Sequence, residues 1–310
     1  MAEQQLIVNS KNSYQEEILD LEKKYMEKIY KIINSAEFIK DLELVEDEIR
    51  DRYSDYKNIW KLKNKIKIPA ERLVYHHIYK AESKEFTINN LYTSAVSSDI
   101  GIIVNDEAVL CIDVKTNDLN GNKDDINKII VERNQNSFDN SGFHELFKVK
   151  SNLDTMMRYK PNYPILTYLI KIIYEDNKFK FCLVKDNENY PTIQLACIPN
   201  GDLSDLFDYN IISGVKTYTY DLKSKYTLSF ESNNEREDFI NNKEGIFAIK
   251  DFKNAYSYNG ITLWKITYGN KKYLAYDRNA NTIRLDYEAV KNRYDSNGKC
   301  WEGIKKIILK

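Results

Sequence analysis

Two aspartates and one lysine between Ser97 and Asp118 have the residue types and the spacing for metal-assisted chemistry. Asp113 and Lys115 are two positions apart on an apolar run, so both side chains project from the same face of a predicted strand. Asp99 stands just before the preceding apolar run, and antiparallel pairing of the two runs brings it to the same end. Carboxylates are hard oxygen ligands suited to Mg²⁺, and a neighbouring lysine can orient an attacking water and stabilise charge on a phosphate. We therefore predict metal-dependent cleavage of phosphodiester bonds, in which Asp99 and Asp113 hold the metal ion.

The element that must position these side chains is a predicted β-hairpin. Residues 100–104 form its first strand, residues 105–108 its turn and residues 109–115 its second strand. Apolar positions alternate with the polar ones on the second strand, which is typical of a strand with one face in a core. A buried strand seldom carries an aspartate and a lysine unless the two pair with each other or bind a ligand. A purely structural ion pair is therefore the alternative to catalysis.

A predicted helix over residues 69–82 lies directly upstream of the hairpin and opens with Pro69. Glu71, in the expected first turn, is a candidate third carboxylate that assists the other two. The helix dipole would stabilise a glutamate there without any function, which is the alternative for this residue. His76 and His77 are adjacent and face different directions, so they indicate packing or surface roles rather than a metal-binding pair.

Downstream of the hairpin, an uninterrupted polar segment has side chains that commonly hydrogen-bond base edges and phosphates. We predict that it contacts DNA; a solvated loop is the alternative. The segment consists of Arg133, Asn134, Gln135, Asn136 and Ser137.

Hydrophobic periodicity divides the chain into three predicted regions. Residues 1–64 form a helical arm, with helices over about 14–34 and 37–63, that packs on the core or on a second subunit. Residues 65–204 form an α/β (α+β) nuclease core with a mixed sheet of about five strands flanked by helices. Residues 205–310 form an appended α+β region for DNA recognition, dimerisation or both.

Within this last region the sequence predicts three helical segments and one hairpin. The helices are expected at residues 235–241, around 287–294 and around 301–308, and the hairpin turns at Gly269 and Asn270.

Composition narrows the function classes. The 46 basic and 47 acidic residues give a net charge of −1, which argues against a general nucleic-acid coat protein but leaves room for a local basic cleft. The four cysteines show no CxxC spacing and indicate a reduced, cytoplasmic protein. No apolar run approaches the roughly 20 residues that span a bilayer, so no membrane partner is expected.

At the hairpin, the sequence SSDIGIIVNDEAVLCIDVKTND resembles the PD-(D/E)xK nuclease motif, and in particular the type II restriction endonucleases grouped with HincII and HpaI. The upstream helix resembles the one that supplies an acidic residue in many members, which corresponds to Glu71. The segment RNQNSF resembles the one in which an Asn approaches the DNA bases, which corresponds to Asn134. Ser98 replaces the nominal Pro of the motif, as happens in many members. The resemblance covers about residues 65–175.

This resemblance implies a restriction-endonuclease-like fold and a homodimer acting on palindromic double-stranded DNA. It also implies Mg²⁺ as the cofactor, replaceable by Mn²⁺, and a cognate DNA methyltransferase as a partner in the same system. Asp99, Asp113 and Lys115 would be catalytic, with Glu71 in support. Two alternatives stay open: another nuclease of this fold, such as an anti-phage effector or a resolvase, and a non-catalytic DNA-binding module.

Overall fold

The structure of the protein is a computed structural model that describes most of the 310 residues. The described residues are 13–55, 66–121, 128–132, 135, 137, 139–140, 149–150, 152–177, 181–201, 226–229, 255–258, 261–268, 271–277, 282–286 and 290–310. Among them, no helix has both the length and the apolar character needed to span a bilayer. The four cysteines all belong to the described residues and form no disulfide.

The helices whose bounds the structure describes before the first strand lie where the periodicity predicts them. They are α2 (Ser13–Ile33), α3 (Ala36–Asp51) and α5 (Lys67–Lys80). The hydroxyl of Ser35 caps α3 by accepting a hydrogen bond of 3.2 Å from the backbone N–H of Phe38. The helix predicted over residues 37–63 is interrupted in the structure: α3 ends at Asp51, Arg52 forms a turn, and residues 53–55 are helical again. Residues 56–65 lie outside the described residues.

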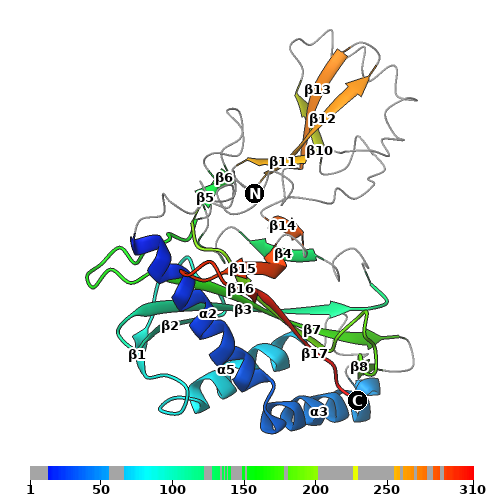
Figure 1. The fold of residues 1–310 in the computed structure, drawn as a ribbon. Helices are drawn as coiled ribbons and strands as arrows, with labels where there is room; N and C mark the ends of the chain where they lie inside the picture. The colour runs from blue at the N-terminus through cyan, green and yellow to red at the C-terminus, as the bar shows by residue number, and fades with distance from the viewer. Residues whose placement is uncertain are drawn as a thin grey trace.

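A seven-stranded mixed sheet forms the centre of the molecule (Figure 1). The strand order is β1-β2-β3-β7-β9-β17, and β8 also pairs with β7. Only β3 and β7 pair in parallel among these strands, whereas the other pairs are antiparallel. The strands are β1 (Ile88–Leu91), β2 (Ile100–Val104), β3 (Ala108–Asp118), β7 (Ile165–Asp176), β8 (Phe181–Leu183), β9 (Ile193–Ile198) and β17 (Ile304–Ile307). The predicted mixed sheet flanked by helices is confirmed, with more strands than the five expected.

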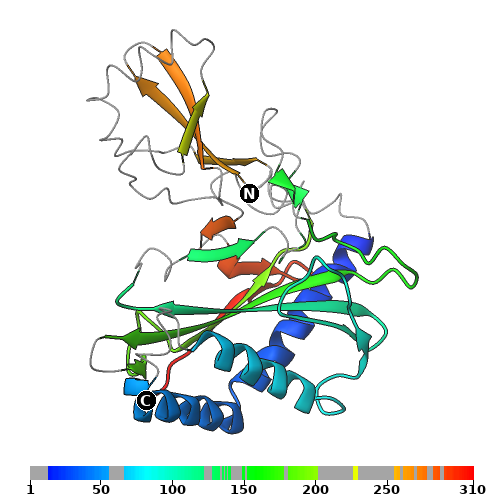
Figure 2. The ribbon, with the colours of Figure 1, turned by 180° about the vertical axis from the view of Figure 1, so that it is seen from behind.

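The three helices cover one face of this sheet, as both ribbon views show (Figures 1 and 2). Leu110, Ile112 and Val114 of β3 point to that face and join one large core with residues of all three helices. Because side chains alternate along a strand, Asp113 and Lys115 lie on the opposite face. The helix layer therefore holds the sheet rigid without covering the predicted site.

The smaller sheets lie on the side of the central sheet away from the helices (Figures 1 and 2). A four-stranded antiparallel sheet has the order β10-β13-β12-β11, and its β12–β13 pairing confirms the hairpin predicted at Gly269 and Asn270. Two further pairs are β14–β4 and β5–β6. Their strands are β4 (Lys128–Glu132), β5 (Asp139–Asn140), β6 (Val149–Lys150), β10 (Tyr226–Ser229), β11 (Ala255–Tyr258), β12 (Ile261–Tyr268), β13 (Lys271–Asp277) and β14 (Thr282–Asp286). The helix predicted at residues 235–241 lies outside the described residues.

The helix predicted around residues 301–308 is wrong. Of the helix predicted around residues 287–294, residues 287–289 lie outside the described residues, Val290 and Lys291 are helical, and residues 292–294 form a strand instead. The chain there forms β15 (Asn292–Tyr294), β16 (Cys300–Glu302) and β17, and β17 adds to the free edge of β9. Ile304 and Ile307 are both buried, and their three-residue spacing is compatible with a helix face as well as with opposite faces of a strand. The unpaired backbone of β9 decides for the strand, because edge N–H and C=O groups require partners.

The predicted regional boundaries do not separate hydrophobic cores. Tyr25 and Ile29 of α2 belong to the same core cluster as the central sheet, and so does Ile307 of β17. A buried ion pair between Glu22 of α2 and Arg293 of β15 also joins the two predicted outer regions. The first and last segments of the chain thus complete the core from residues 65–204.

Candidate active site

The β2–β3 hairpin brings the three predicted catalytic residues together. Its register pairs Ile100 with Ile112 and Val104 with Ala108, as the alternation predicts. Three residues connect Val104 to Ala108, and the backbone N–H of Glu107 donates a hydrogen bond of 3.0 Å to the Val104 carbonyl. Asn105 and Asp106 in this turn have φ values of 50° and 52°, in the left-handed region. This tight turn fixes the register, so the residue before β2 lies opposite the middle of β3.

Asp99 is anchored to β3 through its carboxylate. Its Oδ2 accepts a hydrogen bond of 2.8 Å from the backbone N–H of Val114, the residue between the other two members of the site. Asp113 is only 1% exposed, and its Oδ2 lies 2.8 Å from Nζ of Lys115. The two carboxylates and the ammonium of Asp99, Asp113 and Lys115, here called the catalytic trio, therefore share one face of one hairpin.

Burial raises the pKa of Asp113 to about 7. The ammonium of Lys115 opposes this rise, and the charge of Asp99 adds to it. Oδ1 of Asp113 has no hydrogen-bond partner among the described residues. A buried carboxylate oxygen without a donor is costly unless a cation or a proton occupies it, so the chemistry of this position fits a metal ligand.

Glu71 of α5 is close enough to Asp99 and Lys115 for their charges to influence its pKa. Burial raises its pKa, Asp99 adds to the rise, and Lys67 and Lys115 oppose it. Nζ of Lys67 lies 3.9 Å from the Glu71 carboxylate. Because α5 begins at Lys67, Glu71 is beyond the first turn, and the expectation that it stands in that turn is wrong. Its position therefore owes less to the helix dipole than predicted.

No three His, Cys, Asp or Glu side chains cluster closely enough to hold a metal ion in the described part of the chain. The candidate metal site consequently rests on the pair Asp99 and Asp113, with Glu71 nearby. His77 is buried and its Nε2 lies 2.9 Å from Oδ2 of Asp41, while His76 is exposed. The two histidines thus serve packing and the surface, as predicted.

One described residue of the polar segment predicted to contact DNA, Gln135, contacts the catalytic trio. Oε1 of Gln135 accepts a hydrogen bond of 2.8 Å from Nζ of Lys115, and Ser98 Oγ donates a bond of 3.0 Å to the Gln135 carbonyl. Arg133, Asn134 and Asn136 lie outside the described residues. The structure therefore gives Gln135 a contact with the site itself.

Ser137 is fully buried, which differs from the expected DNA contact. Its hydroxyl donates a hydrogen bond of 2.8 Å to the carbonyl of Ile165 and lies 3.3 Å from Oγ1 of Thr167. The hydroxyl is thus directed into the sheet and away from any ligand surface. Its short polar side chain satisfies a backbone carbonyl at the start of β7.

A row of polar side chains that the sequence pattern does not indicate extends from Lys115 across the sheet. Lys171 of β7 is the direct neighbour of Lys115, Gln194 of β9 is the neighbour of Lys171, and Lys306 of β17 follows. Lys171 is only 4% exposed. The available signal was a single lysine inside the apolar run of residues 165–174, but its neighbour depends on a strand register that the sequence does not contain.

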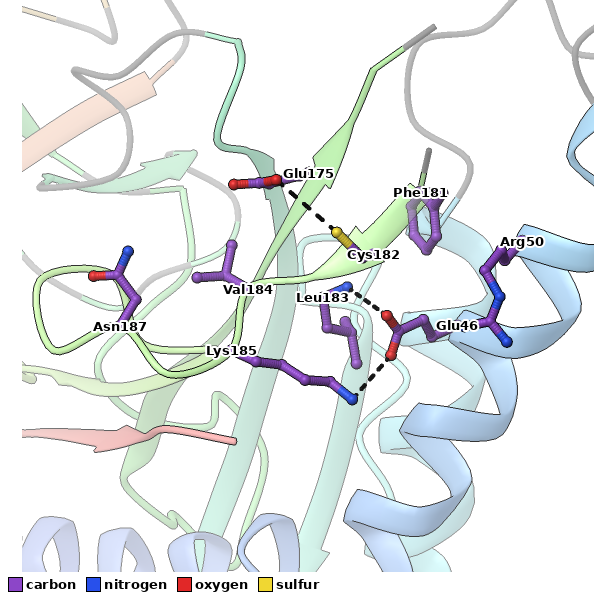
Figure 3. A pocket seen from close by; sticks show the side chains of 9 residues that line it. All are labelled: Glu46, Arg50, Glu175, Phe181, Cys182, Leu183, Val184, Lys185 and Asn187. Atoms are coloured by element: carbon purple, nitrogen blue, oxygen red, sulfur yellow. Dashed lines mark hydrogen bonds and ion pairs between the residues drawn. The ribbon is translucent and has the colours of Figure 1, made fainter. Parts of the chain in front are cut away.

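A separate pocket lies between α3 and the strands β7 and β8 (Figure 3). Oε1 of Glu46 accepts a bond of 3.1 Å from the backbone N–H of Leu183, and its Oε2 lies 3.3 Å from Nζ of Lys185. None of the catalytic trio lines this pocket. Its charged groups stabilise the packing of α3 on the sheet.

Two solved structures are similar to this chain at low identity. The restriction endonuclease BglI bound to its DNA recognition sequence has 10% identity and a TM-score of 0.44, covering 87% of this chain and 91% of BglI. The tetrameric restriction endonuclease SfiI bound to cognate DNA has 12% identity and a TM-score of 0.40, covering 95% of each chain. No curated protein sequence matches this chain.

A family match identifies the chain. Residues 15–178 match the family described as the N-terminal domain of the type II restriction enzyme MwoI. The match includes α2, α3, α5, the β2–β3 hairpin and β7, and therefore every residue of the catalytic trio. The match does not distinguish the HincII and HpaI group. Because it spans more than half of the chain, the protein belongs to the family of type II restriction enzymes represented by MwoI.

Proposed function

We propose that the protein is a Mg²⁺-dependent endonuclease that hydrolyses double-stranded DNA at a short palindromic sequence. The family match supports a restriction nuclease. The observation that carries the proposal is the buried Asp113 carboxylate, which lies beside Lys115 and near Asp99 and has an oxygen without a donor in the described structure. A structural ion pair alone gives no reason to leave that oxygen unsatisfied.

Asp99 and Asp113 would hold the metal ion, and both offer the oxygen ligands that Mg²⁺ and Mn²⁺ accept. When bound, Mg²⁺ polarises the scissile phosphate and lowers the pKa of a coordinated water. Because Asp113 is buried, its carboxylate is held in one orientation by the surrounding sheet, and bulk water does not compete for its oxygens. Asp99 is held in place by the Val114 N–H.

Lys115 orients the attacking water and stabilises the negative charge that develops on the phosphate. An ammonium has three N–H donors, and in this structure two of them point to Asp113 and Gln135. The third donor is directed by these two contacts and can reach a water or a phosphate oxygen. Glu71 assists from α5 by adding negative charge near Asp99.

Several finer properties belong to the same proposal. Arg133, Asn134 and Asn136 contact the DNA, Gln135 supports Lys115, and the buried hydroxyl of Ser137 anchors the segment on β7. The enzyme works as a homodimer, because each strand of a palindrome requires its own active site. A methyltransferase of the same specificity protects the host DNA. Among type II restriction endonucleases, we place the protein beside the group that contains HincII and HpaI.

The test is incubation of the protein with plasmid or phage DNA in millimolar Mg²⁺, with a parallel reaction in EDTA. We expect discrete fragments in Mg²⁺ alone, and sequencing of the ends then gives the site. A smear would favour an indiscriminate effector or resolvase-like nuclease. No cleavage with retained DNA binding would favour a non-catalytic binding module and contradict the proposal.

A variant test addresses the site directly. Asp113→Ala should lower cleavage by more than about a thousandfold, a loss of roughly 4 kcal/mol in transition-state stabilisation, and leave DNA affinity nearly unchanged. Asp51→Ala, at the exposed end of α3, is the matched control and should cleave normally. Cleavage by a clean preparation of Asp113→Ala would refute the assignment.

A further inference from the structure

Gln135 and Ser137 are held by hydrogen bonds to three other segments of the chain, at Ser98, Ile165 and Gly201. Ser98 Oγ bonds the Gln135 carbonyl from the residue next to Asp99. The carbonyl of Ser137 accepts a bond of 3.2 Å from the N–H of Gly201, and its hydroxyl bonds the start of β7. The segment is therefore held at both of its described residues.

The side chain of Gln135 makes the link from this segment to the chemistry. Its Oε1 and Oδ2 of Asp113 each lie 2.8 Å from Nζ of Lys115, so two acceptors define the direction of one ammonium. A neutral amide provides an acceptor for Lys115 without adding negative charge to a site that already holds two carboxylates. Gln135 is thus suited to orient the Lys115 ammonium without neutralising its positive charge.

We infer that Gln135 is a positioning residue that directs the Lys115 ammonium for cleavage. The inference rests on the proposed function, in which Lys115 stabilises the charge that develops on the phosphate. Because Ser98 holds the Gln135 carbonyl and Gly201 holds the Ser137 carbonyl, Oε1 of Gln135 is kept within hydrogen-bond distance of Nζ of Lys115 before DNA binds.

The contact to Lys115 makes this role distinct from direct base reading. A base-reading glutamine would present its amide to the DNA, and its loss would weaken binding to the correct site. Loss of a positioning acceptor instead lowers the rate of the bound complex, because the misdirected ammonium no longer stabilises the phosphate. The two roles therefore differ in which kinetic parameter changes.

The experiment compares Gln135→Leu, which removes the acceptor at similar volume, with Gln135→Glu, which keeps an acceptor. Asn34→Leu, an exposed amide between α2 and α3, is the control. Single-turnover cleavage is measured at saturating enzyme with Mg²⁺ on an oligonucleotide duplex containing the correct site and on one with a single base pair changed. DNA affinity is measured with Ca²⁺ in place of Mg²⁺, and thermal unfolding reports folding.

We expect Gln135→Leu to cleave the correct site about 10- to 100-fold more slowly, with an unchanged unfolding temperature and affinity within about threefold. Its rate on the changed site should fall by a similar factor, because the contact between Gln135 and Lys115 does not involve the bases. Gln135→Glu keeps an acceptor but adds a negative charge beside Asp113, so it should recover only part of the rate on the correct site. If Gln135→Leu does not fold, Gln135→Met carries the same test.

Three outcomes would overturn the inference. A wild-type rate for Gln135→Leu would show that the contact has no role in cleavage. A loss confined to affinity would make Gln135 a DNA contact only, and an equal loss for both variants with lowered stability would make it structural. Failure of the proposed function is seen separately, as absence of cleavage by the wild-type enzyme, and it would overturn the inference as well.

Discussion

At the scale of single residues, the burial of Asp113 sets a distinct pH dependence on the metal-free enzyme. Its pKa in the folded protein is raised to about 7 from the ordinary value of 3.8. Between these two values the folded state keeps a proton that the unfolded state releases. The free energy of unfolding therefore falls as the pH rises from about 4 to 7 and is lowest above that window.

Asp113→Asn removes this titration and should flatten that part of the profile. At pH 8 without metal, we expect the free energy of unfolding of the variant to exceed that of the wild type by about 1–3 kcal/mol. Mg²⁺ should stabilise the wild type and leave the variant unchanged. Urea unfolding in EDTA and in Mg²⁺ at pH 5 and pH 8 measures both effects. A variant less stable than the wild type at pH 8 would contradict the prediction.

At the scale of elements, β17 is part of the core sheet although it comes from the predicted appended region. Ile307 is 6% exposed and joins the core, whereas its neighbour Ile308 is 41% exposed. Ile307→Ala should lower the free energy of unfolding by about 2–4 kcal/mol, because it leaves a cavity in the core. Ile308→Ala is the matched control and should change it by less than about 0.5 kcal/mol. Equal effects in urea unfolding would show that β17 does not contribute to the core.

The same strand shows which elements the sequence can predict. The β2–β3 hairpin was predictable because its partners are adjacent in sequence, their apolar positions alternate, and Asn105 and Asp106 suit the turn. That local information was enough to bring the catalytic trio together. β17 was not predictable, because its partner β9 is far away in sequence and the apolar spacing also fits a helix. The contact between Gln135 and Lys115 has the same origin, since it depends on where a loop crosses the sheet.

At the scale of the whole molecule, one buried ion pair ties α2 to β15. Glu22 and Arg293 are both almost fully buried, and Oε1 of Glu22 also accepts a bond of 2.8 Å from the N–H of Asn200. Burial lowers the pKa of Arg293 to about 9, and the Arg293 guanidinium lies 5.8 Å from the ring centre of Trp301. The ion pair thus joins three segments that are distant in sequence.

Glu22→Gln should be strongly destabilising, because it leaves the guanidinium buried without its counter-charge. We expect a loss of about 3–5 kcal/mol in urea unfolding. Replacing both residues together, as Glu22→Leu with Arg293→Leu, should cost less than Glu22→Gln alone. Glu27→Gln, on the exposed side of the same helix, is the control and should cost less than about 1 kcal/mol. Similar losses for Glu22→Gln and Glu27→Gln would contradict this account.

β15, β16 and β17 come after the other described strands of the chain in sequence, so they are synthesised last during translation. The ribosome synthesises α2, the hairpin and β9 first, and β9 keeps an open edge until β17 emerges and pairs with it. At about 5–20 residues per second, the nascent chain spends several seconds with the catalytic trio already synthesised but the core incomplete. A chain interrupted in this interval carries the catalytic trio on a sheet without its closing strand, with the edge of β9 left unpaired.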